Sequence, residues 1–179
     1  MSKSFRNVAC AALIGVSLAF AATGAGAQAK KNWTAPAHKM YGQKLCDETM
    51  AKHPELISIT LHGVPPGLEK VYTMFAGSFP DRIGNADDPD DIDVITKGIT
   101  ILDPRWRRTN DNPKKFVVLL PMRDAAGENV GLVVYAFKEP PANANTTAAE
   151  REFLVKAAAL RDELAKKTPS YKALFDAAH

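Results

Sequence analysis

Alternating apolar and polar residues along the chain predict a series of short β-strands. In "ELISITLHGV", Ile57, Ile59 and Leu61 would share one face of a strand, and the residues between them would share the other. Pro-Pro-Gly turns the chain after this segment and favours a hairpin with the next one. The predicted strands are residues 55–64, 70–79, 99–102, 116–122 and 130–138.

Helix signals flank these strands at both ends of the chain. Thr34 is expected to cap a first helix with Pro36 in its first turn, and this helix would end at His53, because proline follows it. Thr147 and Glu150 have the spacing of a capping box that opens a C-terminal helix. The expected buried stripe of that helix is Phe153, Ala157, Leu160 and Leu164.

The acidic run "DDPDDIDVITKG" is interpreted as a short helix. Asp88 is placed as the N-cap, Pro89 at the first helical position and Gly98 just after the last turn. A calcium loop of the EF-hand type would need Gly at its sixth position and Glu at its twelfth, and neither is present. The helix dipole accounts for Asp90 and Asp91 without an ion.

The two C-terminal strands predict a sheet that is covered on both faces. Residues 117–120 and 132–134 are apolar at odd and even positions alike, so the side chains on both faces of these strands need burial. The terminal helices can cover one face, and the segment from Phe79 to Arg108 is left to cover the other. The element order predicts one α+β domain spanning residues 34–178.

The segments "SFPDRIGNADDPDDIDVITKG" and "VVLLPMRDAAGENVGLVVYAF" carry a resemblance to the single Cache domains, which are PAS-like extracytoplasmic sensor modules. The resemblance covers most of residues 39–138. It implies a PAS-like (profilin-like) five-stranded antiparallel sheet with the N- and C-terminal helices packed on one face. It also implies a small-molecule pocket between the sheet and the covering segment.

The predicted pocket residues are polar or aromatic side chains of the covering segment and the central strands. Guanidinium and hydroxyl groups among them suit a carboxylate, so an anionic or zwitterionic ligand is expected. His62 is also a candidate ligand for haem iron or a metal in an alternative function. The full set is His62, Tyr72, Arg82, Arg105, Trp106 and Tyr135.

Residues 1–29 have the pattern of an export signal. Lys3 and Arg6 precede an apolar stretch, and small residues offer cleavage after Ala27 or Ala29. The apolar stretch is shorter than the roughly 20 residues that span a bilayer. A periplasmic or secreted protein with no membrane insertion after signal removal is therefore expected. A second alternative function is an interaction module that docks on a membrane-bound signalling receptor.

Charge and motifs exclude several other classes of function. The formal net charge is +3 for the whole chain and +1 once the signal with its two basic residues is removed, which argues against nucleic-acid binding. Cys46 would then be the only cysteine, so no intramolecular disulfide is expected. Neither G-x-S-x-G nor C-x-x-C-H occurs. No enzymatic activity and no cofactor are predicted.

Overall fold

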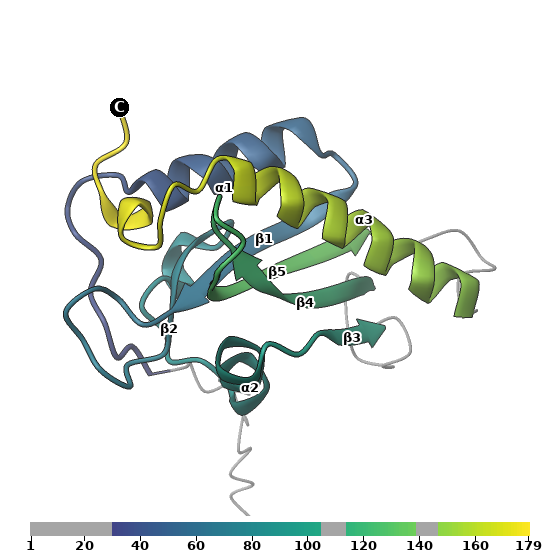
Figure 1. Cartoon of the computed structure of the whole chain (residues 1–179), viewed down its shortest axis with the longest axis horizontal. Coiled ribbons are helices and arrows are strands. Elements are labelled where there is room, and N and C mark those ends of the chain that lie inside the picture. Colours follow the sequence, from purple (N-terminus) through teal and green to yellow (C-terminus); the bar gives the residue numbers. More distant parts are fainter. Residues whose placement is uncertain (1–29, 105–113, 139–146) are drawn as a thin grey trace, which may run out of the picture.

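The computed structural model describes residues 30–104, 114–138 and 147–179, which form one antiparallel sheet between two sets of helices (Figure 1). The sheet has five strands in the order β2-β1-β5-β4-β3, and each neighbouring pair is antiparallel. The strands are β1 (Leu56–Gly63), β2 (Thr73–Gly77), β3 (Ile101–Pro104), β4 (Lys115–Arg123) and β5 (Asn129–Lys138).

The strand order confirms the predicted PAS-like α+β fold. β1 and β2 form one hairpin and β4 and β5 form another, and β1 pairs with β5 to bring the two hairpins together at the centre of the sheet. Asp124 fixes the second turn, because its Oδ1 accepts the amide protons of Ala126 and Glu128 at 2.9 and 3.0 Å. Gly127 adopts a φ of 85° in the same turn, which suits glycine.

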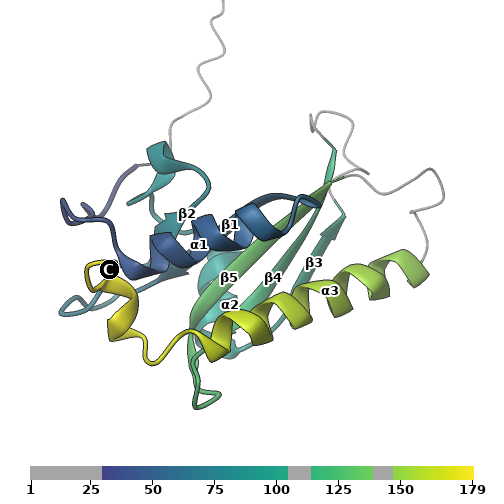
Figure 2. The ribbon, with the colours of Figure 1, turned by 90° about the horizontal axis from the view of Figure 1, so that it is seen from above.

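The main hydrophobic core lies on the face covered by the two long helices, α1 (Tyr41–Lys52) and α3 (Thr147–Lys166) (Figure 2). Phe116 of β4 stacks on Phe153 of α3 with ring centroids 4.8 Å apart. The C-terminal 3-10 turn η3 (Lys172–Phe175) packs against α1 and buries Leu174. The predicted stripe of α3 is confirmed, since Phe153, Ala157, Leu160 and Leu164 are all buried.

The opposite face of the sheet is covered by the chain between β2 and β3. This segment contains the 3-10 turn η1 (Pro80–Arg82) and the helix α2 (Pro89–Lys97), which contacts β5, β4 and β1. A smaller cluster joins Val94 of α2 to Val117 and Leu119 of β4 and to Leu132 and Ala136 of β5. The structure therefore confirms that this segment covers the second face.

The ends of α2 follow the sequence signals. Asp88 is the N-cap and forms a capping box with Asp91, and Pro89 occupies the first helical turn. Gly98 closes the helix in the left-handed region with a φ of 67°, and its amide donates to the carbonyl of Val94 at 3.1 Å.

Two local predictions are wrong. The first helix begins at Tyr41 instead of Thr34, because the preceding segment is held by long-range bridges that pair Lys31 with Asn85 and Met40 with Ala177. Ile57 does not share a cluster with Ile59 and Leu61, because a β-bulge between residues 56 and 58 changes the register and Ile57 packs on the α2 side.

Some predictions fall on residues that the structure does not describe. These are the expected signal at residues 1–29 and the candidate pocket residues Arg105 and Trp106. Among the helices in the described ranges, none has both the length and the apolar character that crossing a membrane requires.

Candidate functional site

A pocket of about 110 Å³ lies between the sheet and the segment that joins β2 to β3. Side chains from β1, β4 and β5 form its floor. Residues from η1 and from the first turn of α2 form its walls. The lining residues are Ser58, Thr60, His62, Phe79, Arg82, Asp88, Asp90, Asp91, Lys115, Val117, Leu119, Val134 and Ala136.

A row of polar side chains on β1 gives the pocket floor its chemistry. Ser58, Thr60 and His62 occupy alternate positions, so all three side chains point to the α2 side, and all three are buried. Their cross-strand partners on β5, Ala136, Val134 and Leu132, are apolar. Polar groups are costly to bury unless they are hydrogen-bonded, so this row requires partners.

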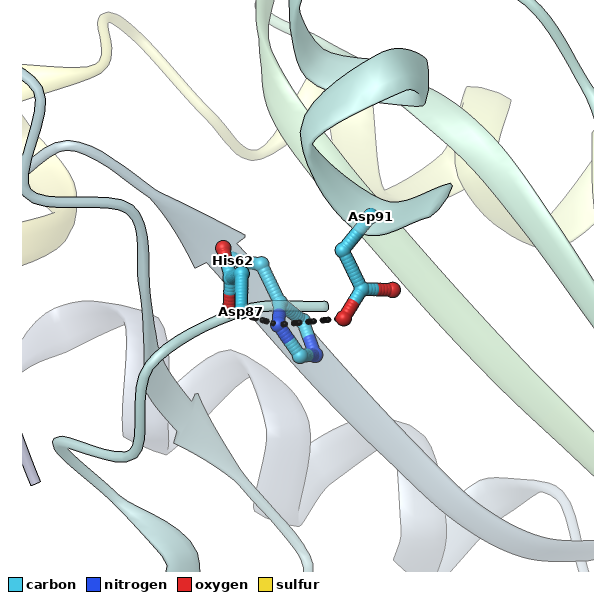
Figure 3. A group of neighbouring side chains, drawn as sticks. All are labelled: His62, Asp87 and Asp91. Carbon is cyan, nitrogen blue, oxygen red and sulfur yellow. Dashed lines mark hydrogen bonds and ion pairs between the residues drawn. The ribbon is translucent and has the colours of Figure 1, made fainter. Parts of the chain in front are cut away.

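His62 finds those partners on both ring nitrogens. Nε2 lies 2.7 Å from Oγ1 of Thr60, and Nδ1 lies 2.7 Å from Oδ1 of Asp87. Oδ2 of Asp91 lies farther away, at 3.9 Å from the same Nδ1 (Figure 3). With Asp87 ionised, Nδ1 must carry a proton, because a carboxylate only accepts hydrogen bonds.

Asp87 sits just before α2 and is held by the backbone. Its amide donates to the carbonyl of Tyr72 at 3.1 Å, which ties this residue to the start of β2. Its side chain is fully buried, with 0% exposure. Oδ1 binds His62, but Oδ2 has no hydrogen-bond partner among the described residues.

Asp91 presents its carboxylate to both the pocket and His62. Burial raises the pKa of the Asp91 carboxyl above its ordinary value. His62 opposes this rise in pKa, whereas the charge of Asp87 adds to it. The Asp88 amide donates to Oδ2 of Asp91 at 3.3 Å, so the capping box also sets the position of this carboxylate.

Positive and negative side chains meet around the pocket. Arg82 comes from η1, where its guanidinium lies over the ring of Phe79 at 5.4 Å from the centroid. Lys115 comes from the start of β4. Asp88, the N-cap of α2, and Asp90, in its first turn, are exposed. The pocket can therefore hold a ligand that carries charges of both signs.

Four of the six residues predicted for the pocket lie in the described ranges, and the structure brings two of these four together. His62 and Arg82 both line it. Tyr135 is fully buried in the main core under α1 and α3, on the opposite face of the sheet. Tyr72 contributes its backbone carbonyl to Asn32 and Asp87, and its side chain is not among the lining residues.

Sequence reasoning missed the residues that surround His62. The sequence places Asp91 in the first turn of a helix and Asp87 at the start of the acidic run before it, and neither position predicts the contact with His62. The alternating pattern predicts Ser58 and Thr60 only as part of the polar side of a strand. The signal that could have found them is the combination of a buried polar row on a central strand with an acidic run directly before a covering helix.

The comparisons with known proteins do not assign a family. No protein-family model matches the chain, and no curated protein matches it. One similar solved structure is a type II free methionine-R-sulfoxide reductase from Thermoplasma acidophilum, with 16% sequence identity, a TM-score of 0.42, and coverage of 70% of this chain and 89% of that chain. Another is the C-terminal domain of the E. coli transcriptional regulator KdgR, with 15% identity, a TM-score of 0.38, and coverage of 75% and 99%.

Proposed function

We propose that this protein is an exported, single-domain binding protein of the Cache type, which holds a small zwitterionic molecule between its sheet and α2. The observation that carries the proposal is the buried polar row of Ser58, Thr60 and His62 on the floor of a pocket with walls of both charges. A sheet face that only packed against α2 would be apolar at these positions, as β4 and β5 are.

The charges favour a zwitterion over a simple anion. A carboxylate of the ligand would bind Arg82 and Lys115, for which the planar guanidinium offers paired donors. An ammonium group would face Asp88 and Asp90 at the start of α2. A ligand with negative charge alone would meet these carboxylates without a compensating group.

The pocket volume limits the size of the ligand. A volume of about 110 Å³ is well below the roughly 300 Å³ at which pockets for drug-sized ligands begin. A small amino acid or a molecule of similar size fits this limit. The ligand is expected to be held without chemical change. The membrane-bound receptor expected from the sequence belongs to this proposal as the partner that senses the bound state.

Thermal unfolding in the presence of a metabolite series tests the ligand class. A ligand at about 100 times its dissociation constant stabilises the native state by roughly 2.7 kcal/mol, which is readily detected. Each small amino acid would be compared with its amide, which lacks the carboxylate, and with its deaminated acid. The proposal expects both analogues to bind at least about tenfold more weakly, because each loses a charge-assisted contact.

Matched variants locate the binding site. Arg82→Ala should weaken binding by a similar factor, whereas Arg151→Ala, which removes an exposed arginine of α3, should leave it unchanged. Equal effects of the two changes, or no stabilisation by any zwitterion, would refute the proposed site. Export is tested separately by fractionating cells that produce the full chain or residues 30–179.

A further inference from the structure

The side chains of His62, Asp87 and Asp91 form a compact group of metal-binding donors at one end of the pocket. One ligand atom from each residue lies within 4.8 Å of the others. The residues come from two parts of the chain, since His62 belongs to β1 and the two aspartates flank the start of α2 (Figure 3). We propose that this group binds a divalent transition-metal ion, with Zn²⁺ and Mn²⁺ as the best-matched ions.

The strongest observation for a metal ion is the unsatisfied, buried carboxylate of Asp87. It is fully buried, and its Oδ2 has no hydrogen-bond partner among the described residues. A buried charged oxygen without a partner is costly, and such an oxygen calls for an explanation such as an ion. A cation that binds both oxygens of this carboxylate, inside the group that already contains His62 and Asp91, would give Oδ2 its missing partner.

The charge balance of the group also favours a divalent cation. Asp87 and Asp91 together carry two negative charges when ionised, and their side chains are 0% and 16% exposed. A protonated His62 can neutralise only one of these charges. A divalent ion bound to a neutral imidazole and two carboxylates makes the group neutral overall.

Thr60 is placed to support a metal-bound imidazole. Histidine ligands of metals usually donate their second ring N–H to a neighbouring acceptor, which fixes the orientation of the ring. When a metal takes Nδ1 of His62, the ring proton moves to Nε2, and Oγ1 of Thr60 is the acceptor at 2.7 Å. Asp91 is held in a similar way by the backbone amide of Asp88.

The donor set indicates the class of metal. One imidazole nitrogen and two carboxylate oxygens suit zinc and manganese, whereas Ca²⁺ prefers six to eight oxygen ligands. Three protein ligands leave at least one coordination position open. Since His62 and Asp91 line the pocket, that position would face it. The separation of 2.7 Å between Nδ1 and Oδ1 of Asp87 must widen slightly for both atoms to bind one ion.

Metal titration of the tag-free, chelator-treated full chain tests the site. Zn²⁺ and Mn²⁺ are expected to bind with a stoichiometry of one and to raise the melting temperature, and Ca²⁺ should bind at least about tenfold more weakly. Nitrogen-detected NMR of the imidazole should show His62 change from the Nδ1–H to the Nε2–H form on adding Zn²⁺. Absence of saturable binding by both transition metals would overturn the proposal.

Variants distinguish this site from the exposed acidic residues nearby. Asp87→Asn and Asp91→Asn should each weaken Zn²⁺ binding more than about 100-fold, because removing a ligand exceeds the roughly 10- to 100-fold effect of outer-shell changes. Asp90→Asn is the matched control, since Asp90 is outside the group but lies in the same helical turn. Equal losses for Asp90→Asn and Asp91→Asn would refute the assignment.

Two milder substitutions keep the proposal testable if Asp87→Asn or Asp91→Asn prevents folding. Thr60→Val preserves the shape of the side chain and removes the acceptor for Nε2, so it should weaken Zn²⁺ binding by about tenfold. Ser58→Ala is the control on the same face of β1, and because Ser58 makes no hydrogen bond to His62 among the described contacts, it should leave the Zn²⁺ affinity unchanged. Unchanged metal affinity in Thr60→Val would remove the supporting role of Thr60. Binding of a zwitterion is measured separately on the metal-free, chelator-treated protein. The failure of the metal site and the failure of the proposed function can therefore be told apart.

Discussion

Replacing Tyr135 by phenylalanine should stabilise this protein. Tyr135 is fully buried in the main core, and its hydroxyl has no hydrogen-bond partner among the described residues. Burial also raises the pKa of this hydroxyl far above its ordinary value, so it stays protonated. Tyr135→Phe removes the unsatisfied group and keeps the ring, whose centroid lies 6.4 Å from that of Phe137.

The expected magnitude follows from the cost of an unsatisfied buried group. That cost is about 1–3 kcal/mol, so the free energy of unfolding should rise by a similar amount. In a domain of this size, 1 kcal/mol shifts the melting temperature by roughly 2–4 °C. Urea denaturation monitored by circular dichroism measures this change in the free energy of unfolding directly. An m-value equal to that of the unsubstituted protein would show that the two unfolded states are comparable.

Tyr171→Phe is the matched control, because the same oxygen is removed from a hydroxyl that has a partner. The Tyr171 hydroxyl donates to the carbonyl of Val64 at 2.9 Å, so its loss should destabilise the protein by about 1 kcal/mol. The two variants should therefore differ in sign. A loss of stability in Tyr135→Phe comparable to that in Tyr171→Phe would refute the reasoning, because it would mean that the Tyr135 hydroxyl is satisfied.

Three further predictions, one on thiol reactivity and two on substitutions, test other parts of the fold. Burial raises the pKa of the Cys46 thiol, so in a protein of residues 30–179, where Cys46 is the only cysteine, the native state should not react with a thiol reagent even above about pH 8.5, where a free thiol ionises. Reaction should appear only on unfolding. Leu174→Ala should cost about 2–5 kcal/mol in urea denaturation, because Leu174 is fully buried between η3 and α1. Gly98→Ala should cost about 1–2 kcal/mol, because Gly98 has a φ of 67°, and a negligible change would contradict the assigned helix end.

Elements with strong local signals could be predicted from the sequence. Asp88, Pro89 and Gly98 define α2, because capping depends on residues within a few positions of each other. Thr34 and Pro36 carry similar signals but do not start a helix, because Lys31 and Met40 pair with residues far away in the chain. Local propensity is a weak constraint where such tertiary contacts decide the backbone.

The candidate site was predictable only in part. His62 shares the polar face of the first predicted strand with Ser58 and Thr60, and this position makes it a candidate from the sequence alone. Tyr135 lies on a strand that is apolar at both parities, so the sequence did not show which face it occupies, and the register with β1 and β4 places it in the main core. The contact between His62 and Asp87 joins residues 25 positions apart, which no local pattern reveals.

The two faces of the sheet are held with unequal strength. Of its own residues α2 buries only Val94, whereas α3 buries four. Segments with few buried apolar contacts open with less free energy than the global unfolding reaction. We expect the amide protons of α2 to exchange with deuterium through sub-global opening, well before those of α3. A ligand could then enter and leave the pocket through this opening while α1 and α3 stay packed on the other face of the sheet.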